Sequence, residues 1–446
     1  MTPLRTAVSV LLCAAFLNAC AAPAKDGAMA SGADPALTAF IGKIRAVDHH
    51  GHPNSVVPVD TDFDALPLDG IPIELPASFA PGHPDWVAAS KALYQFPYPD
   101  RTEAHVAELR TTVQRVAKEQ GEKFPVWVLD QLGTEVYLAN RIAMGPGLEA
   151  PRYRWVSFGD PLMLPLSTKA EAAVTPDRQK LYPLSEKLLK RYLADLKITA
   201  LPATLDEYIK TVVTPTLEAQ RKGGAVGIKF EAAYLRSLDF AEVSAPAAAK
   251  IYAAYIRGGE PSHADYKTLE DFLFRAIARE AGRLGMPVQI HSFEGFGNSY
   301  SIAGSDPFLL ESAIDDPTLA KTNFVIVHGG GVYAAHTGAL LGKPNVYADF
   351  SLMTTAYPEA RLAGILRGWL TQYPQKVLFG SDAAAFGPDL GWELVAWIGT
   401  KNGRGALTSA LTDMIGSGEV TRARAEEIAT MVMRTNASGL YQLGLK

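Results

Sequence analysis

The sequence predicts an α/β protein built on one (β/α)8 barrel, and three observations carry that prediction. From residue 225 onward, short apolar runs of strand type alternate with amphipathic helical stretches, which is the pattern of a parallel sheet. Several of these runs end in histidine, lysine or aspartate, and a (β/α)8 barrel assembles its active site from such strand ends. No GxGxxG or phosphate-loop motif is present, so a dinucleotide-binding fold lacks its main signature.

The first strand is expected in the short apolar run at residues 41–47, and a histidine cluster follows it. Three of the nine histidines of the chain, His49, His50 and His52, fall within four positions. Alternation along a strand places Asp48, His50 and His52 on one face and His49 on the other. Two imidazoles at one strand end can bind one metal ion, and Asp48 either orients an imidazole or ends the strand. We therefore predict a metal site here.

The N-terminal residues 1–19 read as an export signal, with Arg5 before an apolar stretch too short to span a bilayer. Leu17-Asn18-Ala19-Cys20 resembles a lipoprotein lipobox, which implies cleavage before Cys20 and a lipid on its sulfur. The alternative is an ordinary secretory signal with a spectator cysteine. Residues 20–34, rich in Ala and Gly, are expected to be a flexible tether, and 35–446 the catalytic domain. Because Ala21 follows the cysteine, the resemblance implies the periplasmic side of the outer membrane.

The composition of the chain excludes some classes of partner and of catalytic chemistry. The formal charge of -5 and the pI near 6.0 leave no basic surplus, so we expect no nucleic-acid partner. No apolar run after the signal reaches the length of a membrane span, and the expected membrane contact is the lipid alone. The two cysteines, Cys13 and Cys20, fall in the signal and at its end, which excludes a catalytic thiol and a disulfide from the domain.

The first half of the domain is expected to hold the early strands and two insertions. Residues 54–100 and 163–200 interrupt the β/α rhythm and are predicted to shape the substrate pocket. Helices are expected at 101–120 and 205–222, and strands at 126–129, 136–139 and 153–158.

The second half is more regular. Strands are expected at 225–230, 287–290, 323–327, 345–348 and 376–379, helices at 266–284 and 359–372, and closing helices from residue 387. Residues of metal-ligand type then stand at five strand ends, namely His50 with His52, Lys229, His291, His328 and Asp382.

This order of HxH, Lys, His, His and a late Asp resembles the amidohydrolase superfamily of metal-dependent barrels. The spacing is most similar to its broad amidohydrolase-related branch, which includes hydrolases, decarboxylases and the amidohydrolase-like half of some glutamine-synthetase-related proteins. The segment GIKFEAAYLR at 227–236 is similar to a stretch of the last group. The resemblance extends from residue 44 to about residue 400.

The resemblance implies a ligand set. His50, His52 and Asp382 would bind a first metal ion, which His291 joins in mononuclear members. In binuclear members His291 and His328 would hold a second ion, and a carboxylated Lys229 would bridge the two. Glu231 falls on the same strand face as Lys229 and could neutralise it as a plain ammonium group, so the sequence leaves one metal or two open.

Imidazole and carboxylate ligands suit a divalent ion, with Zn²⁺ the first choice. The expected function is hydrolysis of an amide, ester or lactone of a small molecule, with Asp382 and His328 as catalytic residues. The alternatives are a mononuclear zinc decarboxylase of a small unsaturated or aromatic acid and a non-catalytic binding lipoprotein. Three residues are candidates for binding a substrate carboxylate, namely Arg236, Tyr234 and Arg141.

Overall fold

The computed structural model describes residues 33–68, 71, 77–80 and 82–445. The expected signal peptide at 1–19, the lipid-attachment residue Cys20 and most of the tether at 20–34 lie outside the described residues. The domain that begins at residue 35 is described almost throughout.

The core of the molecule is a sheet of eight parallel strands that neighbour one another in chain order. The strands are β1 (Ala46–Gly51), β2 (Thr134–Asn140), β3 (Tyr153–Phe158), β4 (Ala225–Phe230), β5 (Val288–His291), β6 (Phe324–Val327), β7 (Val346–Asp349) and β8 (Val377–Leu378). The sheet closes between its first and last strands. There the backbone N–H of His49 donates to Phe379 O at 3.1 Å, and that of Asp382 donates to His50 O at 2.9 Å. The predicted (β/α)8 barrel is confirmed.

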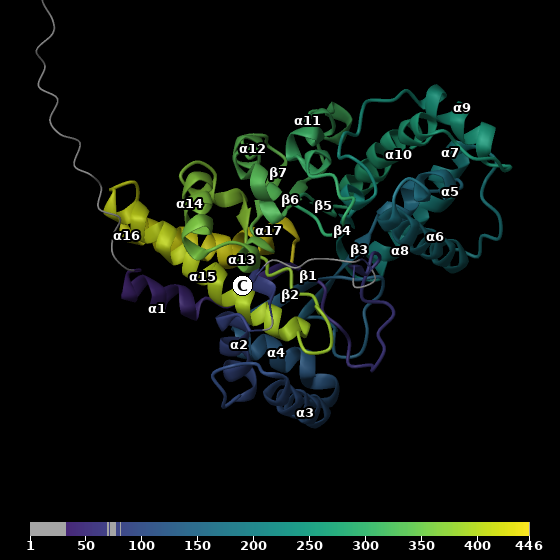
Figure 1. Cartoon of the computed structure of the whole chain (residues 1–446). Coiled ribbons are helices and arrows are strands. Elements are labelled where there is room, and N and C mark those ends of the chain that lie inside the picture. The colour runs from purple at the N-terminus through teal and green to yellow at the C-terminus, as the bar shows by residue number, and fades with distance from the viewer. Residues whose placement is uncertain (1–32, 69–70, 72–76, 81, 446) are drawn as a thin grey trace, which may run out of the picture.

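Helices surround this barrel on its outside (Figure 1). The first group is α1 (Pro35–Lys43), α2 (Pro84–Tyr94), α3 (Glu103–Gln120) and α4 (Phe124–Leu132). The middle group is α5 (Lys169–Ala172), α6 (Pro176–Asp195), α7 (Leu205–Tyr208), α8 (Thr214–Lys222), α9 (Ala245–Tyr255) and α10 (His263–Arg283). The last group is α11 (Glu311–Ile314), α12 (Ala334–Leu340), α13 (Met353–Ala356), α14 (Glu359–Leu370), α15 (Trp392–Gly416), α16 (Arg422–Thr430) and α17 (Asn436–Leu440). The expected C-terminal helices are α15 to α17.

Two strand predictions were wrong. The run at 41–47 begins inside α1, which ends at Lys43 and whose Leu37 and Ile41 are buried, and β1 begins only at Ala46. The run at 126–129 belongs to α4, which has a proline in its first turn and ends on Gly133 in the left-handed conformation. Both runs are short and apolar, and periodicity does not separate a buried helix from a buried strand at that length. The ranges 153–158 and 225–230, in contrast, are strands β3 and β4 as expected.

The inside of the barrel is filled from the C-terminal segment. Tyr441, which follows α17, is buried in one apolar cluster with Val47 of β1, Leu138 of β2, Val327 of β6 and Leu378 of β8. The hydroxyl of this tyrosine reaches polar groups above the cluster, as described below. The chain end therefore supports the floor of the barrel.

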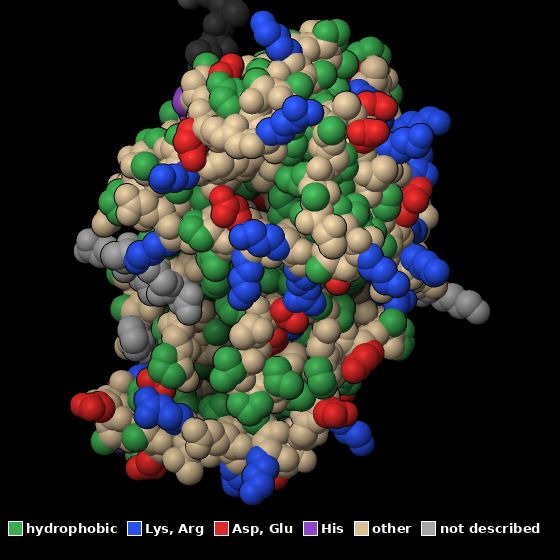
Figure 2. Space-filling model, turned by 90° about the vertical axis from the view of Figure 1, so that its right-hand side faces the viewer, with side chains coloured by type: hydrophobic (Ala, Val, Ile, Leu, Met, Phe, Trp, Pro, Cys, Tyr) green, Lys and Arg blue, Asp and Glu red, His purple; other side chains and the backbone are tan. Residues whose placement is uncertain are grey.

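The surface carries both signs of charge. On the face shown in Figure 2, acidic and basic side chains are interspersed, and apolar side chains gather around a hollow in its lower half. Among the helices of the described ranges, none has the length and apolar character needed to cross a bilayer.

Candidate active site

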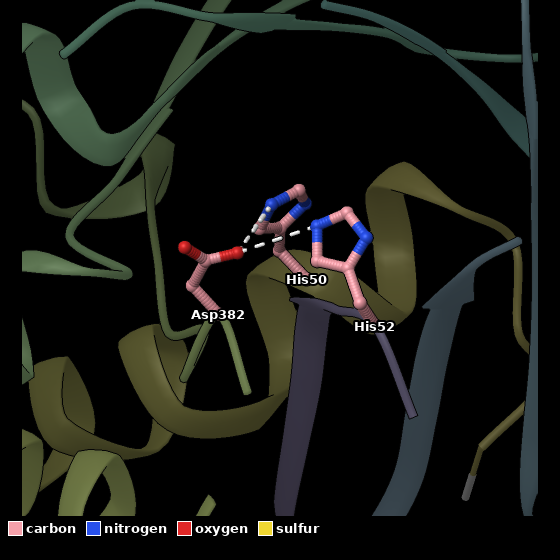
Figure 3. Close-up of side chains that lie close together, drawn as sticks. All are labelled: His50, His52 and Asp382. Atoms are coloured by element: carbon pink, nitrogen blue, oxygen red, sulfur yellow. Dashed lines mark ion pairs between the residues drawn. The ribbon is translucent and has the colours of Figure 1, made fainter. Parts of the chain in front are cut away.

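Three side chains from the two strand ends that close the barrel point toward one another (Figure 3). His50 lies at the end of β1 and His52 directly after it, while Asp382 follows β8. The Nε2 atoms of His50 and His52 lie 3.1 Å and 3.4 Å from Asp382 Oδ1. Both imidazoles are buried. The structure therefore brings the two ends of the sequence motif to one point.

β1 departs from simple strand alternation at this place. Its pairing with β2 slips between Asp48 and Gly51, and both His49 and His50 turn to the inside. His49 is fully buried, with Nε2 2.5 Å from Asp349 Oδ2 and Nδ1 3.2 Å from the hydroxyl of Tyr441. The prediction that His49 faces away from the site was wrong, because a bulge resets which residues share a face.

Asp48 binds backbone and not an imidazole. Its Oδ1 accepts from the N–H of Ser381 at 3.0 Å and of His50 at 3.4 Å. It thereby ties β1 to the segment after β8, next to Asp382. The sequence left two roles open for Asp48, to orient an imidazole or simply to end the strand. The structure supports neither of them, because the carboxylate binds backbone N–H groups.

His328 enters the same site from the end of β6, through an unusual turn. Its Nε2 lies 3.9 Å from Asp382 Oδ2, and its backbone has a φ of 64°, followed by three glycines that also have positive φ. Leu352 and Asp382 have positive φ as well, at 58° and 53°. Non-glycine residues rarely adopt this conformation, and strained backbone of this kind gathers at functional sites.

His291, the last residue of β5, completes the histidine group. Its ring centroid lies 4.8 Å from that of His328 and 4.6 Å from that of Tyr234. Its Nε2 is buried and has no hydrogen-bond partner among the described residues. A buried nitrogen without a partner is costly, so this atom indicates that something else is bound here.

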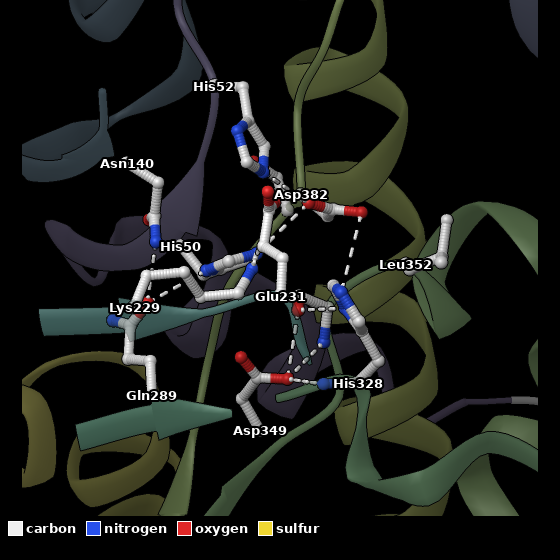
Figure 4. A network of polar contacts seen from close by, with 12 residues as sticks. His50, His52, Asn140, Lys229, Glu231, Gln289, His328, Asp349, Leu352 and Asp382 are labelled. Atoms are coloured by element: carbon white, nitrogen blue, oxygen red, sulfur yellow. Dashed lines mark hydrogen bonds and ion pairs between the residues drawn. The ribbon is translucent and has the colours of Figure 1, made fainter. Parts of the chain in front are cut away.

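The Nδ1 atoms of His50 and His328 are each held by a hydrogen bond, and that of His52 lies beside a carboxylate; Figure 4 shows the contact of His50 with Gln289. His50 Nδ1 lies 3.1 Å from Gln289 Oε1, His328 Nδ1 lies 2.8 Å from Ser351 Oγ, and His52 Nδ1 makes an ion-pair contact of 2.9 Å with Asp64. The hydroxyl of Ser351 donates to Asp349, so it accepts from His328. In His50 and His328, where Nδ1 carries the proton, Nε2 is left with a lone pair directed at Asp382.

Lys229 and Glu231 reach the site from β4 and the residue after it. Lys229 Nζ lies 3.5 Å from His50 Nε2 and 3.7 Å from Glu231 Oε1. Both side chains are buried. Lys229 and Glu231 therefore lie on the same face, as the sequence predicted. Glu231 is close enough to balance an ammonium charge on Lys229.

Burial and charge set the protonation of these groups. Burial lowers the pKa of His50 to about 3 and that of His328 to about 4, and it lowers the pKa of His291 well below its ordinary value. Burial also lowers the pKa of His52, but Asp64 and Asp382 outweigh it and raise the pKa to about 10. For Asp382, the nearby histidines outweigh burial and hold its pKa well below its ordinary value.

A cavity of about 610 Å³ opens above this cluster. The first insertion contributes much of its wall, through Phe63, Asp64, Leu66, Pro67, Leu68 and Ile71. Residues 384–388, after Asp382, form another side. The second expected insertion, 163–200, contributes no lining residue to this cavity; its helix α6 lines a separate cavity of about 220 Å³. Tyr234 is shared by the two cavities.

Of the three residues predicted to bind substrate, only Tyr234 lines the larger cavity. Arg236 is buried and bonds to Glu270 and Asp271, at 3.0 Å and 2.5 Å, and to two backbone carbonyls. Arg141 is buried as well and donates to Asp60, to Pro53 O and to Ala143 O. These placements do not support the predicted role of the two arginines, because a substrate would have to displace bonds that hold the loops together.

Few sequence features point to the residues that contact the imidazoles. Gln289 stands in an apolar strand run and Asp64 in an insertion without periodicity. Asp349 follows a predicted strand, which is the only pattern that could have drawn attention to it. Gln289 and Asp349 come from strands distant in the chain from His50 and His49, which they contact, whereas Asp64 lies only 12 positions after His52.

The side chains present fit a divalent metal ion. The Nε2 atoms of His50 and His328, the Nε2 of His52, which becomes a ligand once a metal ion displaces its proton, a carboxylate of lowered pKa and an unpartnered His291 Nε2 converge on one volume. One nitrogen each of His50 and His52 and an oxygen of Asp382 lie within 4.8 Å of one another. Imidazole and carboxylate ligands with an open position are typical of catalytic metal sites.

Fold and site together define a metal-dependent barrel enzyme. The chain belongs to the amidohydrolase family, because the amidohydrolase family model matches residues 215–443, just over half of its length. Over 184 residues the chain is also 27% identical to protein fluG of Emericella nidulans. That match covers 40% of this chain and 20% of fluG, so the chain spans about a fifth of the length of this curated relative.

Solved structures of distant sequence share the fold. A Lactobacillus casei protein assigned as a metal-dependent hydrolase matches with a TM-score of 0.61 at 15% identity, over 92% of this chain and 98% of that one. Glucuronate isomerase from Caulobacter crescentus matches with a TM-score of 0.62 at 13% identity, over 92% and 94%. Uronate isomerase from Thermotoga maritima gives 0.56 at 13%, over 91% and 96%. These likenesses show the barrel fold.

Proposed function

We propose that this protein is a metal-dependent hydrolase that cleaves an amide, ester or lactone bond of a small molecule. The observation that carries the proposal is the convergence of the Nε2 atoms of His50, His52 and His328 on Asp382 below a cavity. His50, His52, His291 and Asp382 would hold one metal ion, for which Zn²⁺ is the first choice. The bound ion supplies a Lewis acid that makes water nucleophilic at neutral pH.

The protein groups have separate tasks in this proposal. Asp382, ionised because its pKa is lowered, accepts the proton of the attacking water and passes it to the leaving group. His328 presents the lone pair of Nε2, because its Nδ1 is bonded to Ser351. In this one-ion proposal it therefore acts as a second acceptor for a proton. The apolar wall of the first insertion excludes bulk water from the reacting bond.

The cavity favours hydrolysis over decarboxylation of a small acid. A decarboxylase needs a cationic group to hold the carboxylate of its substrate. Among the described residues that line the cavity, Lys229 is the one Lys or Arg side chain, and Glu231 lies 3.7 Å from it. Both arginines proposed for this task are bonded elsewhere.

Lys229 also bears on the number of metal ions. An ammonium group beside Glu231 supports a single ion, whereas a carboxylated lysine would place two anions next to each other. We therefore propose one ion and an uncarboxylated Lys229. Metal content of the purified full chain tests this: one equivalent is expected, and two equivalents after growth with bicarbonate would contradict it.

The reaction is tested with panels of amides, esters, lactones and small unsaturated acids, offered to the zinc-loaded full chain. We expect turnover in one of the first three classes. Asp382→Asn should lower kcat by about 10²- to 10⁴-fold, because it removes the proton acceptor, while circular dichroism shows an intact fold. Release of carbon dioxide from an acid, or full activity in the variant, would overturn the proposal.

We further propose that Cys20 carries a lipid that anchors the enzyme on the periplasmic side of the outer membrane. The lipobox-like Leu17-Asn18-Ala19-Cys20 supports this. Expressed in a Gram-negative host, the full chain should fractionate with membranes, and Cys20→Ser should release it to the soluble fraction with unchanged specific activity. A wild-type protein found in the soluble fraction would contradict the anchor.

A further inference from the structure

The cavity above the histidine cluster combines apolar walls with two carboxylates near its floor. Phe63, Leu66 and Phe386 are among the apolar residues that line it. Asp64 comes from the first insertion and Glu231 from the end of β4, so two elements far apart in the chain supply the acidic groups. An oxygen of each carboxylate and a nitrogen of His52 all lie within 4.8 Å of one another.

Glu231 has an oxygen that nothing in the described structure satisfies. The side chain is 7% exposed and lines the cavity, and its Oε2 has no hydrogen-bond partner among the described residues. Its Oε1 lies 3.7 Å from Lys229, beyond hydrogen-bond distance. Figure 4 shows the carboxylate directed toward His52 and Asp382. A buried acceptor left unpaired is costly, and a ligand that donates to it removes that cost.

Asp64 adds negative charge at the same place. Its Oδ2 contacts His52 Nδ1, and its Oδ1 accepts from the backbone N–H of Leu66, which fixes the side chain at the cavity wall. An anionic substrate group would meet two carboxylates here, and like charges at this distance repel in a buried setting. A cationic donor would be attracted by both carboxylates, against the opposing charge of Lys229, which lies 3.7 Å from Glu231. The bound cation would also keep Glu231 ionised against burial, which raises the pKa of Glu231 to about 8.

We propose that the cavity binds a substrate with an apolar body and a protonated amino group, and that Glu231, assisted by Asp64, binds the ammonium. The proposal rests on the hydrolytic function and narrows its substrate class to amides or esters whose apolar body carries a free amino group near the scissile carbonyl. A three-donor ammonium satisfies Glu231 Oε2 and lies beside the histidine cluster, which places the neighbouring carbonyl carbon at the reacting position.

Binding of two small probes with the same phenyl body tests this without turnover. Phenethylammonium chloride and phenethyl alcohol are titrated calorimetrically into the metal-loaded full chain at pH 7. The ammonium probe is expected to bind about tenfold tighter or more, as a charge-assisted hydrogen bond allows. Glu231→Gln should remove that difference while changing the affinity for the alcohol less than about twofold, as expected when only the charged contact is lost. Asp64→Asn should reduce the difference in part.

Glu294→Gln is the matched control. Glu294 follows β5 and accepts from the hydroxyl of Tyr357 and the N–H of Val332, and it does not line this cavity. The control should keep the preference for the ammonium probe. Equal binding of the two probes to the wild type would overturn the proposal. A second metal equivalent that is lost in Glu231→Gln would also overturn it, because the carboxylates would then serve a metal ion. Because binding is measured without catalysis, a failed hydrolysis assay leaves this result interpretable.

Discussion

Gln289 determines which nitrogen of His50 faces the metal site. Its Oε1 accepts from Asn140 Nδ2 at 2.8 Å and lies 3.1 Å from His50 Nδ1. Its Nε2 donates to the carbonyl of His49 and to the hydroxyl of Tyr441. With both ends of the amide engaged, the oxygen cannot turn away from His50. The imidazole is thus fixed in the tautomer that leaves Nε2 available.

Replacing Gln289 with methionine should therefore weaken metal binding. The change keeps the side-chain volume but removes the acceptor behind His50, and loss of such a partner costs about 10- to 100-fold in metal affinity. Competition with a chelator measures the dissociation constant for Zn²⁺. Affinity within twofold of the wild type would show that Gln289 does not position His50.

A second buried glutamine provides the control for this substitution. Gln220 in α8 accepts from the hydroxyl of Ser157 at 2.8 Å, away from the histidine cluster. Gln220→Met should cost about 1–3 kcal/mol of stability, as expected for a buried hydrogen bond, and leave the zinc affinity unchanged. The comparison separates loss of stability from loss of ligand orientation.

At the scale of elements, the turn after β6 explains how His328 reaches the site. Gly329, Gly330 and Gly331 all have positive φ, which residues with a side chain adopt only at a cost. The space is also filled: a Cβ on Gly331 would lie 1.8 Å from Glu294 Oε2, and one on Gly329 would lie 2.3 Å from Trp369. Glycine is therefore required here by both conformation and packing.

Gly331→Ala should destabilise the protein by about 1–3 kcal/mol, the cost of one strained residue, and lower activity by displacing His328. Gly364→Ala is the control, because Gly364 lies in α14 and no atom stands within 4 Å of its added Cβ. That change should stabilise by about 0.5–1 kcal/mol. Urea unfolding measures both. A Gly331 variant as stable as the wild type would show that the turn can relax.

At the scale of the whole molecule, metal binding and pH are linked through His52. In the metal-free protein, Asp64 and Asp382 hold the pKa of His52 at about 10, so the imidazole carries an extra proton throughout the neutral range. A metal ion must displace that proton to bind Nε2. The pKa values of His50 and His328 are about 3 and 4, so these two rings are already neutral and release no proton when the metal ion binds.

Because only His52 loses a proton when the metal ion binds, metal affinity is expected to rise with pH. A group protonated before binding and deprotonated after it makes metal affinity rise with pH, by about tenfold per unit for one proton, up to about pH 10. Calorimetric titration with Zn²⁺ in buffers of different ionisation enthalpy should show one proton released per ion between pH 6 and 9. Absence of proton release would mean that His52 is neutral before the metal binds.

Most of the barrel could be predicted from the chain because its signals are local. Strands β3 and β4 were expected at their observed bounds, because a buried strand bounded by turns leaves a short apolar run in the sequence. The helix α4 was not, because its apolar run lacks a distinguishing period at that length. The bulge in β1 that turns His49 inward also leaves no local signal.

The sequence by itself determined the barrel and the set of ligand-type residues at its strand ends, because both follow from periodicity and spacing along the chain. Tertiary structure decided which partner holds each of these groups. Gln289 holds His50, Asp64 contacts His52, and neighbouring carboxylates bind the arginine expected to face substrate. Except for Asp64 and His52, which are 12 positions apart, these contacts join residues more than 30 positions apart, and only the folded chain brings them within bonding distance.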